Sequence, residues 1–523
     1  MQNTSLQNSA QRQSGITAIF IIIILSAIFV RLIGFLNMNV VFRDSVGFCI
    51  NAGKLMGNPK QGIKAYTQEP IHPAIIGTIF KILFPDKPIT QTYGLAKYWQ
   101  QILFGDGILF TCLIIIAIFT LTKTFWSVST GLWAAMLFAF HREAVILSIN
   151  GMSELPYLTF FLSALYFIYI SGISSKKSMN IGYGICSGLF IILSILTRKE
   201  GLSLILIAII FFLFFLKNKR LSHKILSLIS ILISCCIGAG IFYAIGGRFY
   251  WLDAFFKYCV QWQNLTQQLR HSAIGSYSLL ASVRPTSISQ LLSLPISGLF
   301  QIGGYIPFIL FLAYLPLRKR IKSIPNGTIL ILLALFVHLA LAIFYVFATG
   351  LFVRRYLFVS SVLMLPFAAA TIHYLTEQFS DKYEKNRIIA ITAITITVIM
   401  APQGIWRYIK SDYHKELINT TQWLNQNSPE NAMLFVRDIR LGFYSNRNWI
   451  TFRDDPKFVK TLPEKYLTKN TPCYIICPNK AKFDKWNELI TIVLPEYKLI
   501  IRKEIPYKKN KKKMIIAVIS HNT

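Results

Sequence analysis

The stretch ITAIFIIIILSAIFV, residues 16–30, contains no charged side chain, and LSLILIAIIFFLFFL, residues 202–216, is equally apolar. About 20 such residues in a helix cover the roughly 30 Å hydrocarbon core of a bilayer. Backbone polar groups find no water in lipid, so segments of this kind cross membranes as helices that satisfy their own hydrogen bonds. We therefore predict a mainly α protein, built as a polytopic transmembrane helical bundle.

The rest of the sequence repeats this pattern, since 54% of its 523 residues are hydrophobic and the mean hydropathy is +0.50. We predict about eleven spans, and counts from ten to twelve fit the segments. They lie at roughly 16–36, 101–122, 128–141, 154–171, 181–197, 200–216, 225–245, 296–316, 328–349, 356–375 and 388–405.

The formal net charge is +32, and many of the basic residues sit in short loops between these spans. If the N-terminus is cytoplasmic, the loops on its side hold fourteen Lys and Arg residues, and the short loops on the other side hold five. This asymmetry follows the positive-inside rule. It predicts a multi-pass protein of the cell (inner) membrane with a cytoplasmic N-terminus and an extracytoplasmic, or periplasmic, C-terminal tail. Anionic lipid headgroups explain such basic loops without nucleic acid, which we do not expect as a partner.

The predicted topology leaves three long segments on the outer, extracytoplasmic side of the membrane. Two are loops, at 37–100 and 246–295, within a transmembrane domain that we assign to residues 1–405. The third is the tail, 406–523, where helical and strand-like patterns alternate and predict a small α/β domain. Its expected helix is Glu416–Asn427, and its expected strands are Ala432–Val436, Tyr474–Cys477 and Met514–Ile519.

The eight cysteines are scattered along the chain. Cys473 and Cys477 stand four apart in a predicted strand, roughly 13 Å from one another, which is too far for a disulfide. No Cys and His cluster has zinc spacing, so we predict no metal site from these residues. A divalent metal ion stays open as a cofactor, and no other cofactor is expected.

The first outer loop opens with RDSVGFCINAGKLM, residues 43–56. Its apolar residues recur at helical spacing, which predicts an amphipathic helix on the membrane surface. Asp44 opens that helix. A carboxylate at this place either stabilises the helix N-terminus or serves a site.

The same loop continues as YTQEPIHPAIIGTIFKILF, residues 66–84. Pro70 and Pro73 break the chain here, and a second apolar helix is expected from about Ala74. Glu69 and His72 lie at the break. A lone Glu or His in such a turn is more often structural than catalytic.

The order of these features resembles the first outer loop of the GT-C superfamily of membrane glycosyltransferases, which includes protein O-mannosyltransferases and the aminoarabinose transferase of lipid A. An early Asp is followed by a surface helix, an E-P-x-H-P turn and another helix. Further similarities follow in the family's order, over about residues 16–375. They are NGMSELPYLTFFLSALYF at 150–167, LTRKEGLSLIL at 196–206 and RRYLFVSSVLMLPF at 354–367.

This resemblance implies a glycosyltransferase that takes a sugar from a polyprenyl-phosphate-linked donor. The sugar would pass to a hydroxyl of a lipid, glycan or protein acceptor on the outer side of the membrane. In the family the Asp of the first loop is the general base and the reaction inverts the anomeric centre. Asp44 matches that position.

Several charged residues are predicted near the outer face, where Lys and Arg are normally depleted. Arg198, Lys199, Arg354 and Arg355 either reach outward to lipid headgroups or bind the donor phosphate, for which Arg has the right bidentate geometry. The acidic candidates are Glu69, Glu154 and Glu200, and the last two have the alternative of simply pairing with the arginines. His72 and Tyr356 are further site candidates.

Other functions remain open at this stage. A lipid or polysaccharide transporter or flippase without transferase activity is the main alternative, although the sequence lacks repeated halves and a pair of Gly/Pro-broken helices. An O-antigen ligase or polymerase would also transfer sugars, but through a large late outer loop. A purely structural membrane protein would have little use for acids and arginines at the outer face.

Overall fold

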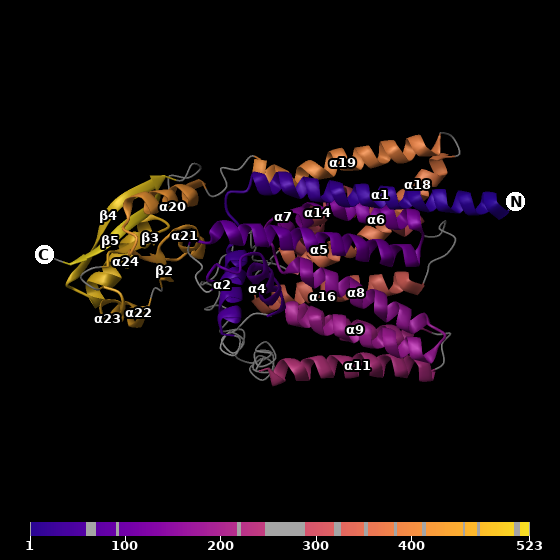
Figure 1. Cartoon of the computed structure of the whole chain (residues 1–523), viewed down its shortest axis with the longest axis horizontal. Helices are drawn as coiled ribbons and strands as arrows, with labels where there is room; N and C mark the ends of the chain where they lie inside the picture. The colour runs from indigo at the N-terminus through magenta and orange to yellow at the C-terminus, as the bar shows by residue number, and fades with distance from the viewer. Residues whose placement is uncertain are drawn as a thin grey trace. The chain divides into compact units, whose positions relative to one another are not determined.

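A computed structural model describes most of the chain (Figure 1). The described ranges are 2–58, 70–89, 94–216, 221–245, 288–317, 326–349, 354–380, 384–409, 415–452, 455–467, 471–506 and 513–521. The chain forms two compact units. Unit 1 comprises 1–36, 60–72 and 104–406, and unit 2 comprises 37–59, 73–103 and 407–523. The tail therefore folds together with two segments of the first loop.

Unit 1 is a bundle of long helices that lie side by side (Figure 1). In its first half the elements are α1 (Gln2–Leu36), α5 (Ala96–Phe125, in unit 1 from Phe104), α6 (Val128–Ala139), α7 (Arg142–Ile149), α8 (Glu154–Ile173), α9 (Lys177–Thr197), η1 (Lys199–Leu202), α10 (Ser203–Ile210), η2 (Phe211–Phe215) and α11 (Leu221–Ala244). In its second half they are α14 (Ile288–Gly303), α15 (Tyr305–Leu317), α16 (Asn326–Thr349), η4 (Arg354–Leu357), α17 (Phe358–Leu363), α18 (Leu365–Ser380) and α19 (Lys385–Ile409).

Among the described residues, eight helices are long and apolar enough to cross a membrane, and ten if each of two bent pairs is one span. The protein is thus a mainly α, multi-pass membrane protein, as predicted. The bent pairs are α6 with α7, at 55°, and α14 with α15, at 118°. The predicted span at 200–216 differs from expectation, because it consists of the 3-10 turn η1, the eight-residue helix α10 and the π-helical turn η2.

Arg31 stabilises the break between α6 and α7 from inside the bundle. Its side chain is fully buried, and its Nη1 donates to the carbonyl oxygen of Ala139 at 2.8 Å. That carbonyl belongs to the last turn of α6, where helical carbonyls lack a partner within the helix. Its Nε donates to Thr111 Oγ1 at 3.0 Å. A buried charge inside a first span is expensive, and these bonds offset its cost.

Helices α9 and α11 pack closely because the contact is lined by small side chains. A Cβ on Gly188 would lie 2.6 Å from the carbonyl oxygen of Ile231, so only glycine fits there. Ser234 donates from Oγ to the carbonyl oxygen of Ile185 across the same contact, at 3.1 Å. Small residues and hydroxyl groups are what hold helices together in lipid, where apolar burial gives no preference. The opposite face of α11 carries an exposed stripe of Ile225, Ile229, Ile233, Ile237 and Ile241.

Unit 2 contains a five-stranded mixed sheet with the order β2-β1-β3-β5-β4. The strands are β1 (Met433–Val436), β2 (Asn448–Thr451), β3 (Cys473–Cys477), β4 (Tyr497–Pro506) and β5 (Lys513–His521). Strand β1 pairs in parallel with β2 and β3, whereas β5 is antiparallel to both β3 and β4. The predicted α/β domain is therefore present. Strands β2 and β4 are additions to the prediction, and β4 is mostly exposed, so its pattern lacks a buried run.

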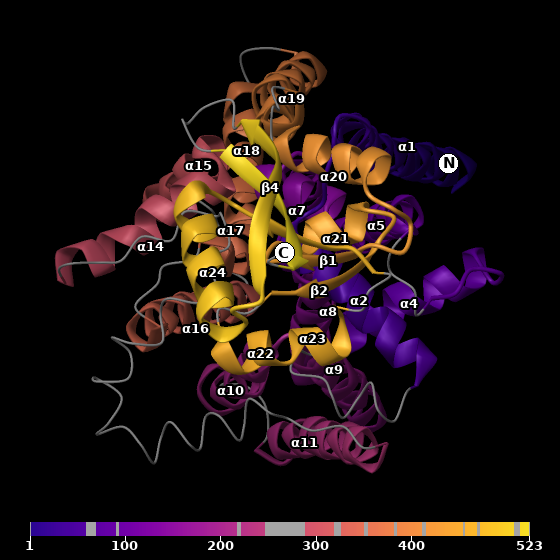
Figure 2. The same ribbon diagram turned by 90° about the vertical axis from the view of Figure 1, so that its left-hand side faces the viewer.

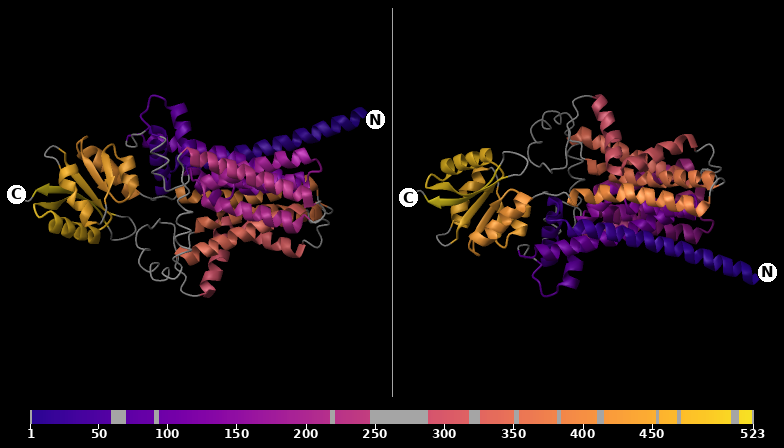
Figure 3. Two further views of the ribbon diagram at one scale, coloured as in Figure 1. Left: turned by 90° about the horizontal axis from the view of Figure 1, so that it is seen from below. Right: turned by 90° about the horizontal axis from the view of Figure 1, so that it is seen from above.

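Helices cover both faces of this sheet (Figures 2 and 3). One face packs on α24 (Lys480–Val493) with the short α22 (Pro456–Lys460) and α23 (Leu462–Lys465), around Phe435 and Trp486. The other packs on α20 (Lys415–Asn427) and α21 (Ile439–Tyr444), around Leu434 and Leu424. Cys473 and Cys477 are both buried in β3.

The first loop contributes two helices, α2 (Arg43–Gly57) and α4 (Ile71–Leu83). The helix predicted at 43–56 is confirmed by α2, and its place on the membrane surface stays a prediction. The second helix begins at Ile71 rather than Ala74, because proline is tolerated in a first helical turn and Pro73 stands there. Of the second predicted outer loop, residues 288–295 belong to α14, and 246–287 lie outside the described residues.

Candidate functional site

Two helix ends of unit 1 bring a carboxylate and a guanidinium together. Helices α8 and α9 are joined by a three-residue loop and pack against each other, so the start of α8 lies beside the end of α9. Glu154 is the first residue of α8, where a carboxylate interacts favourably with the helix dipole. Arg198 follows α9 directly in an extended backbone conformation, with φ −156° and ψ 134°. The chain then turns into η1, which holds Glu200.

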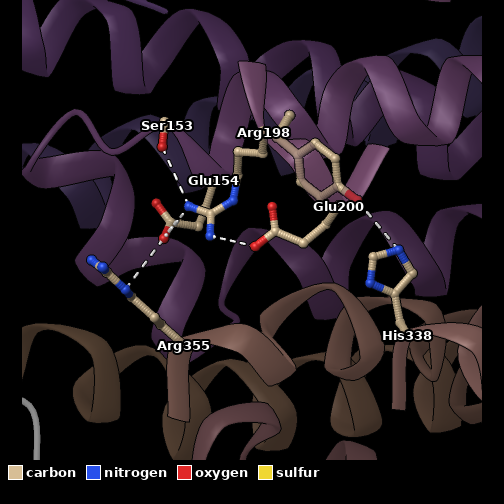
Figure 4. A network of polar contacts seen from close by, with 7 residues as sticks. Ser153, Glu154, Arg198, Glu200, His338 and Arg355 are labelled. Carbon is tan, nitrogen blue, oxygen red and sulfur yellow. Dashed lines mark hydrogen bonds and ion pairs between the residues drawn. The ribbon is translucent and has the colours of Figure 1, made fainter. Parts of the chain in front are cut away.

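Arg198 is the centre of a polar network (Figure 4). Its Nη1 donates to Oε1 of Glu154 at 2.9 Å, and its Nη2 donates to Oε1 of Glu200 at 3.0 Å. The same Nη1 lies 3.4 Å from the Oγ of Ser153. The Arg198 side chain is 15% exposed and that of Glu154 only 3%, so both ion pairs are shielded from bulk water and stronger than surface pairs.

Arg355, from η4, joins the network on the other side of Glu154. Its Nε lies 3.8 Å from Oε1 of Glu154, and its terminal nitrogens extend beyond that carboxylate, away from Arg198 (Figure 4). The second oxygen of Glu154, Oε2, is buried and makes no hydrogen bond within the described part of the chain. Two arginines thus share one carboxylate oxygen.

The ion pairs keep Arg198 and Glu200 charged. Partial burial alone would lower the pKa of Arg198, but Glu200 and Glu154 outweigh it and raise that pKa well above its usual value. Burial likewise would raise the pKa of Glu200, yet the Arg198 guanidinium reverses the shift and lowers it. Two carboxylates balance two guanidinium groups, so with the exposed Lys199 the cluster has a formal charge of +1.

Two tyrosines form an aromatic wall beside these cations. The rings of Tyr345 and Tyr356 are 4.3 Å apart at their centroids. Lys199 Nζ lies 5.5 Å from the centroid of Tyr345, and the guanidinium carbons of Arg198 and Arg355 lie 5.9 Å and 6.0 Å from that of Tyr356. These distances are within the range of cation–π attraction.

A buried histidine extends the polar cluster into the bundle. His338 of α16, labelled in Figure 4, has its Nε2 3.3 Å from the hydroxyl of Tyr157 and 3.4 Å from the hydroxyl of Ser203. All three side chains are buried. Buried polar groups of this kind form hydrogen bonds with one another because water does not reach them.

The structure thus joins five of the predicted site residues: Glu154, Arg198, Lys199, Glu200 and Arg355, with Tyr356 as their aromatic neighbour. The other predicted residues belong to the helices of the first loop or lie outside the described residues. Asp44 is half-buried in the first turn of α2, in unit 2, and the N-cap is Phe42 rather than Asp44. Glu69 and the side chain of Arg354 lie outside the described residues.

His72 contacts a residue that sequence reasoning overlooked. Its Nε2 lies 3.1 Å from Oδ2 of Asp106 on α5, and both side chains are fully buried. An aspartate within an apolar span was the available signal, because intramembrane charges mark special sites. His338 and Tyr345 were also missed, although each is likewise a polar side chain within an apolar stretch. Within the described ranges, no three His, Cys, Asp or Glu side chains group as metal ligands would.

Solved structures of membrane glycosyltransferases align with most of this chain. Oligosaccharyltransferase AglB from Archaeoglobus fulgidus, bound to an inhibitory peptide and a dolichol-phosphate, aligns with a TM-score of 0.55 and 14% identity over 94% of this chain and 73% of its own. ArnT from Cupriavidus metallidurans, bound to undecaprenyl phosphate, aligns with a TM-score of 0.62 and 10% identity over 97% of this chain and 98% of its own. The chain has the fold of the GT-C membrane glycosyltransferases.

The GT-C fold also covers a third solved structure, the arabinofuranosyltransferase AftD from Mycobacteria. Its TM-score is 0.51 with 10% identity, over 96% of this chain and 40% of AftD. No protein-family profile and no curated protein sequence matches the chain. The resemblance of its motifs to GT-C enzymes is therefore confirmed at the level of fold.

Proposed function

We propose that this protein is a membrane glycosyltransferase that moves a sugar from a polyprenyl-phosphate-linked donor to an acceptor hydroxyl on the outer side of the membrane. The observation that carries the proposal is the network of Glu154, Arg198, Glu200 and Arg355 within a GT-C fold. Structural neighbours support the donor class, because two of them were solved with dolichol-phosphate or undecaprenyl phosphate bound.

We assign the donor phosphate to four basic residues. Arg198, Lys199, Arg354 and Arg355 are the residues, and guanidinium groups match phosphate oxygens in two-point contacts. Arg198 is already held by two carboxylates, at 2.9 and 3.0 Å, so its main contribution is to fix the cluster. Arg355, whose terminal nitrogens extend past Glu154, is the side chain we assign to direct phosphate contact (Figure 4).

The chemistry follows from the leaving group. The acceptor hydroxyl attacks the anomeric carbon, the bond from that carbon to the phosphate oxygen breaks, and polyprenyl phosphate leaves as an anion. Nearby cations stabilise the developing charge, so a strong general acid is unnecessary. The hydroxyl proton must go to a base, and a single carboxylate is sufficient. We assign this role to Asp44, with inversion at the anomeric carbon.

The acceptor is a lipid, glycan or protein hydroxyl, and the N-terminus is cytoplasmic with the tail outside. The competing function is a lipid or polysaccharide transporter or flippase without transferase activity. Both functions require binding of a lipid phosphate, but only a transferase breaks the sugar–phosphate bond.

The deciding experiment measures cleavage of the sugar–phosphate bond. The purified chain is placed in nanodiscs, the co-purifying lipid is identified by mass spectrometry, and the lipid-linked sugar fraction extracted from cell membranes is added together with a membrane extract as acceptor source. Release of polyprenyl phosphate is then followed with time. Steady release that stops when the acceptor extract is left out supports the transferase. Binding of the lipid fraction without release would replace the proposal with the transporter.

A further inference from the structure

The segment that precedes Asp44 is attached to the tail domain through two successive residues of unit 2. Val40 is 2% exposed, and its side chain packs in the apolar core formed by Leu434 and Leu441. The next residue, Val41, donates its backbone N–H to the hydroxyl of Tyr444 at 3.0 Å. Asp44 follows only three residues later, so this attachment restricts where α2 begins.

Tyr444 is the last residue of α21, and its hydroxyl accepts a second hydrogen bond. The donor is Nε2 of Gln100 on α5, at 2.7 Å. The hydroxyl therefore joins three parts of the sequence: the first loop before α2, the start of α5 and the tail. Burial raises the pKa of Tyr444, so the group stays a neutral phenol at physiological pH.

Helix α21 also packs against α2, the helix that holds Asp44. Asp438 caps α21 by accepting from the backbone N–H of Arg440, and its carboxylate also pairs with the Arg440 side chain at 2.6 Å. Burial alone would raise the pKa of Asp438, but Arg440 and, more weakly, Arg43 lower it. Arg43 is the first residue of α2, and α2 packs against α21. The start of the helix that holds Asp44 is thus held by both apolar and polar contacts.

We propose that Tyr444 is a positioning residue, through which the tail domain fixes the start of α2 and with it the carboxylate of Asp44. This inference rests on the proposed role of Asp44 as general base. It assigns the tail a task in the reaction: a base placed even 1 Å out of reach loses much of its effect on rate. Tyr444 itself contacts neither donor nor acceptor in this assignment, so donor affinity is independent of it.

The test uses the full chain in nanodiscs and the variant Tyr444→Phe, which keeps the ring and removes only the hydroxyl. Tyr466→Phe is the matched control, because Tyr466 packs its ring against Phe435 in the same domain. Amide hydrogen exchange over residues 41–48 should accelerate roughly 10-fold in Tyr444→Phe, since Val41 and Gln100 lose a hydrogen-bond acceptor. Release of polyprenyl phosphate should slow by roughly 10-fold, while binding of undecaprenyl phosphate stays unchanged.

Unchanged exchange over residues 41–48 would overturn the inference, and so would faster exchange with normal turnover. A matching loss of undecaprenyl phosphate affinity would also overturn it, because the effect would then be general. The variant Asp44→Asn tests the proposed role of Asp44 independently of Tyr444. Normal release of polyprenyl phosphate by Asp44→Asn would contradict that role, whatever the result for Tyr444→Phe.

Discussion

Nη1 of Arg198 lies 2.9 Å from Oε1 of Glu154, although 44 residues separate the two in sequence. Glu154 opens one membrane helix and Arg198 ends the next, so the pair depends on the antiparallel packing of α8 and α9. Its low exposure makes it a fixed part of the site rather than a surface pair of small energetic value.

Removal of Arg355 tests the phosphate assignment. Arg355→Ala should weaken binding of undecaprenyl phosphate by roughly 1.5–3 kcal/mol, as expected for a lost charge-assisted pair. Arg142→Ala is the control, because it removes the same charge from an arginine that donates to the carbonyl oxygen of Gln301. Binding is measured by native mass spectrometry in detergent. Unchanged affinity in both Arg355→Ala and Arg198→Ala would withdraw the phosphate role.

The variant Asp44→Asn distinguishes two roles of Asp44, that of a general base and that of a residue that only stabilises the start of α2. Asn keeps the size of the side chain but cannot accept the proton, so release of polyprenyl phosphate in a single turnover should fall roughly 100-fold to 10,000-fold. Donor binding should persist. Asp86→Asn, an exposed aspartate of the same loop, is the control and should leave the rate unchanged. A near-normal rate in Asp44→Asn would move the search for the base to Glu69 and Glu154.

Orientation in the membrane is predicted from fourteen basic residues in the loops of one side and five in those of the other. A tag after Thr523 should be labelled by a membrane-impermeant reagent in intact cells, and a tag before Met1 should be labelled only after lysis. The reverse pattern would place the charged cluster and the tail in the cytoplasm and contradict the outer-side reaction.

The close contact of α9 and α11 predicts a strong effect of a single methyl group. Gly188→Ala should lower the free energy of unfolding by roughly 1–3 kcal/mol, and with it the melting temperature, because the added Cβ would lie 2.6 Å from the Ile231 carbonyl oxygen. Gly182 stands on the same helix with no atom within 4 Å of an added Cβ, so Gly182→Ala should be neutral or slightly stabilising. Equal melting temperatures of the two variants would contradict the observed packing.

The sequence alone determined that the chain is a membrane bundle with a small α/β tail, because apolar runs of helix length and strand alternation are local patterns. It also indicated Glu154, Arg198, Glu200 and Arg355 individually, since charges at the ends of apolar spans are costly and therefore informative. Which of these residues meet was decided only by tertiary structure. Arg198 bridges two glutamates because the ends of α8 and α9 coincide, and no local pattern encodes that distance.

The same distinction explains what was missed. The apolar run at 199–215 forms a 3-10 turn, an α-helix and a π-helical turn in succession, and its hydrophobicity alone does not specify these local changes of helix type. Tyr444 and Val41 lie 403 residues apart, and their hydrogen bond forms only when the tail folds onto the first loop. Local sequence specifies which elements form, whereas long-range packing decides which side chains share a site.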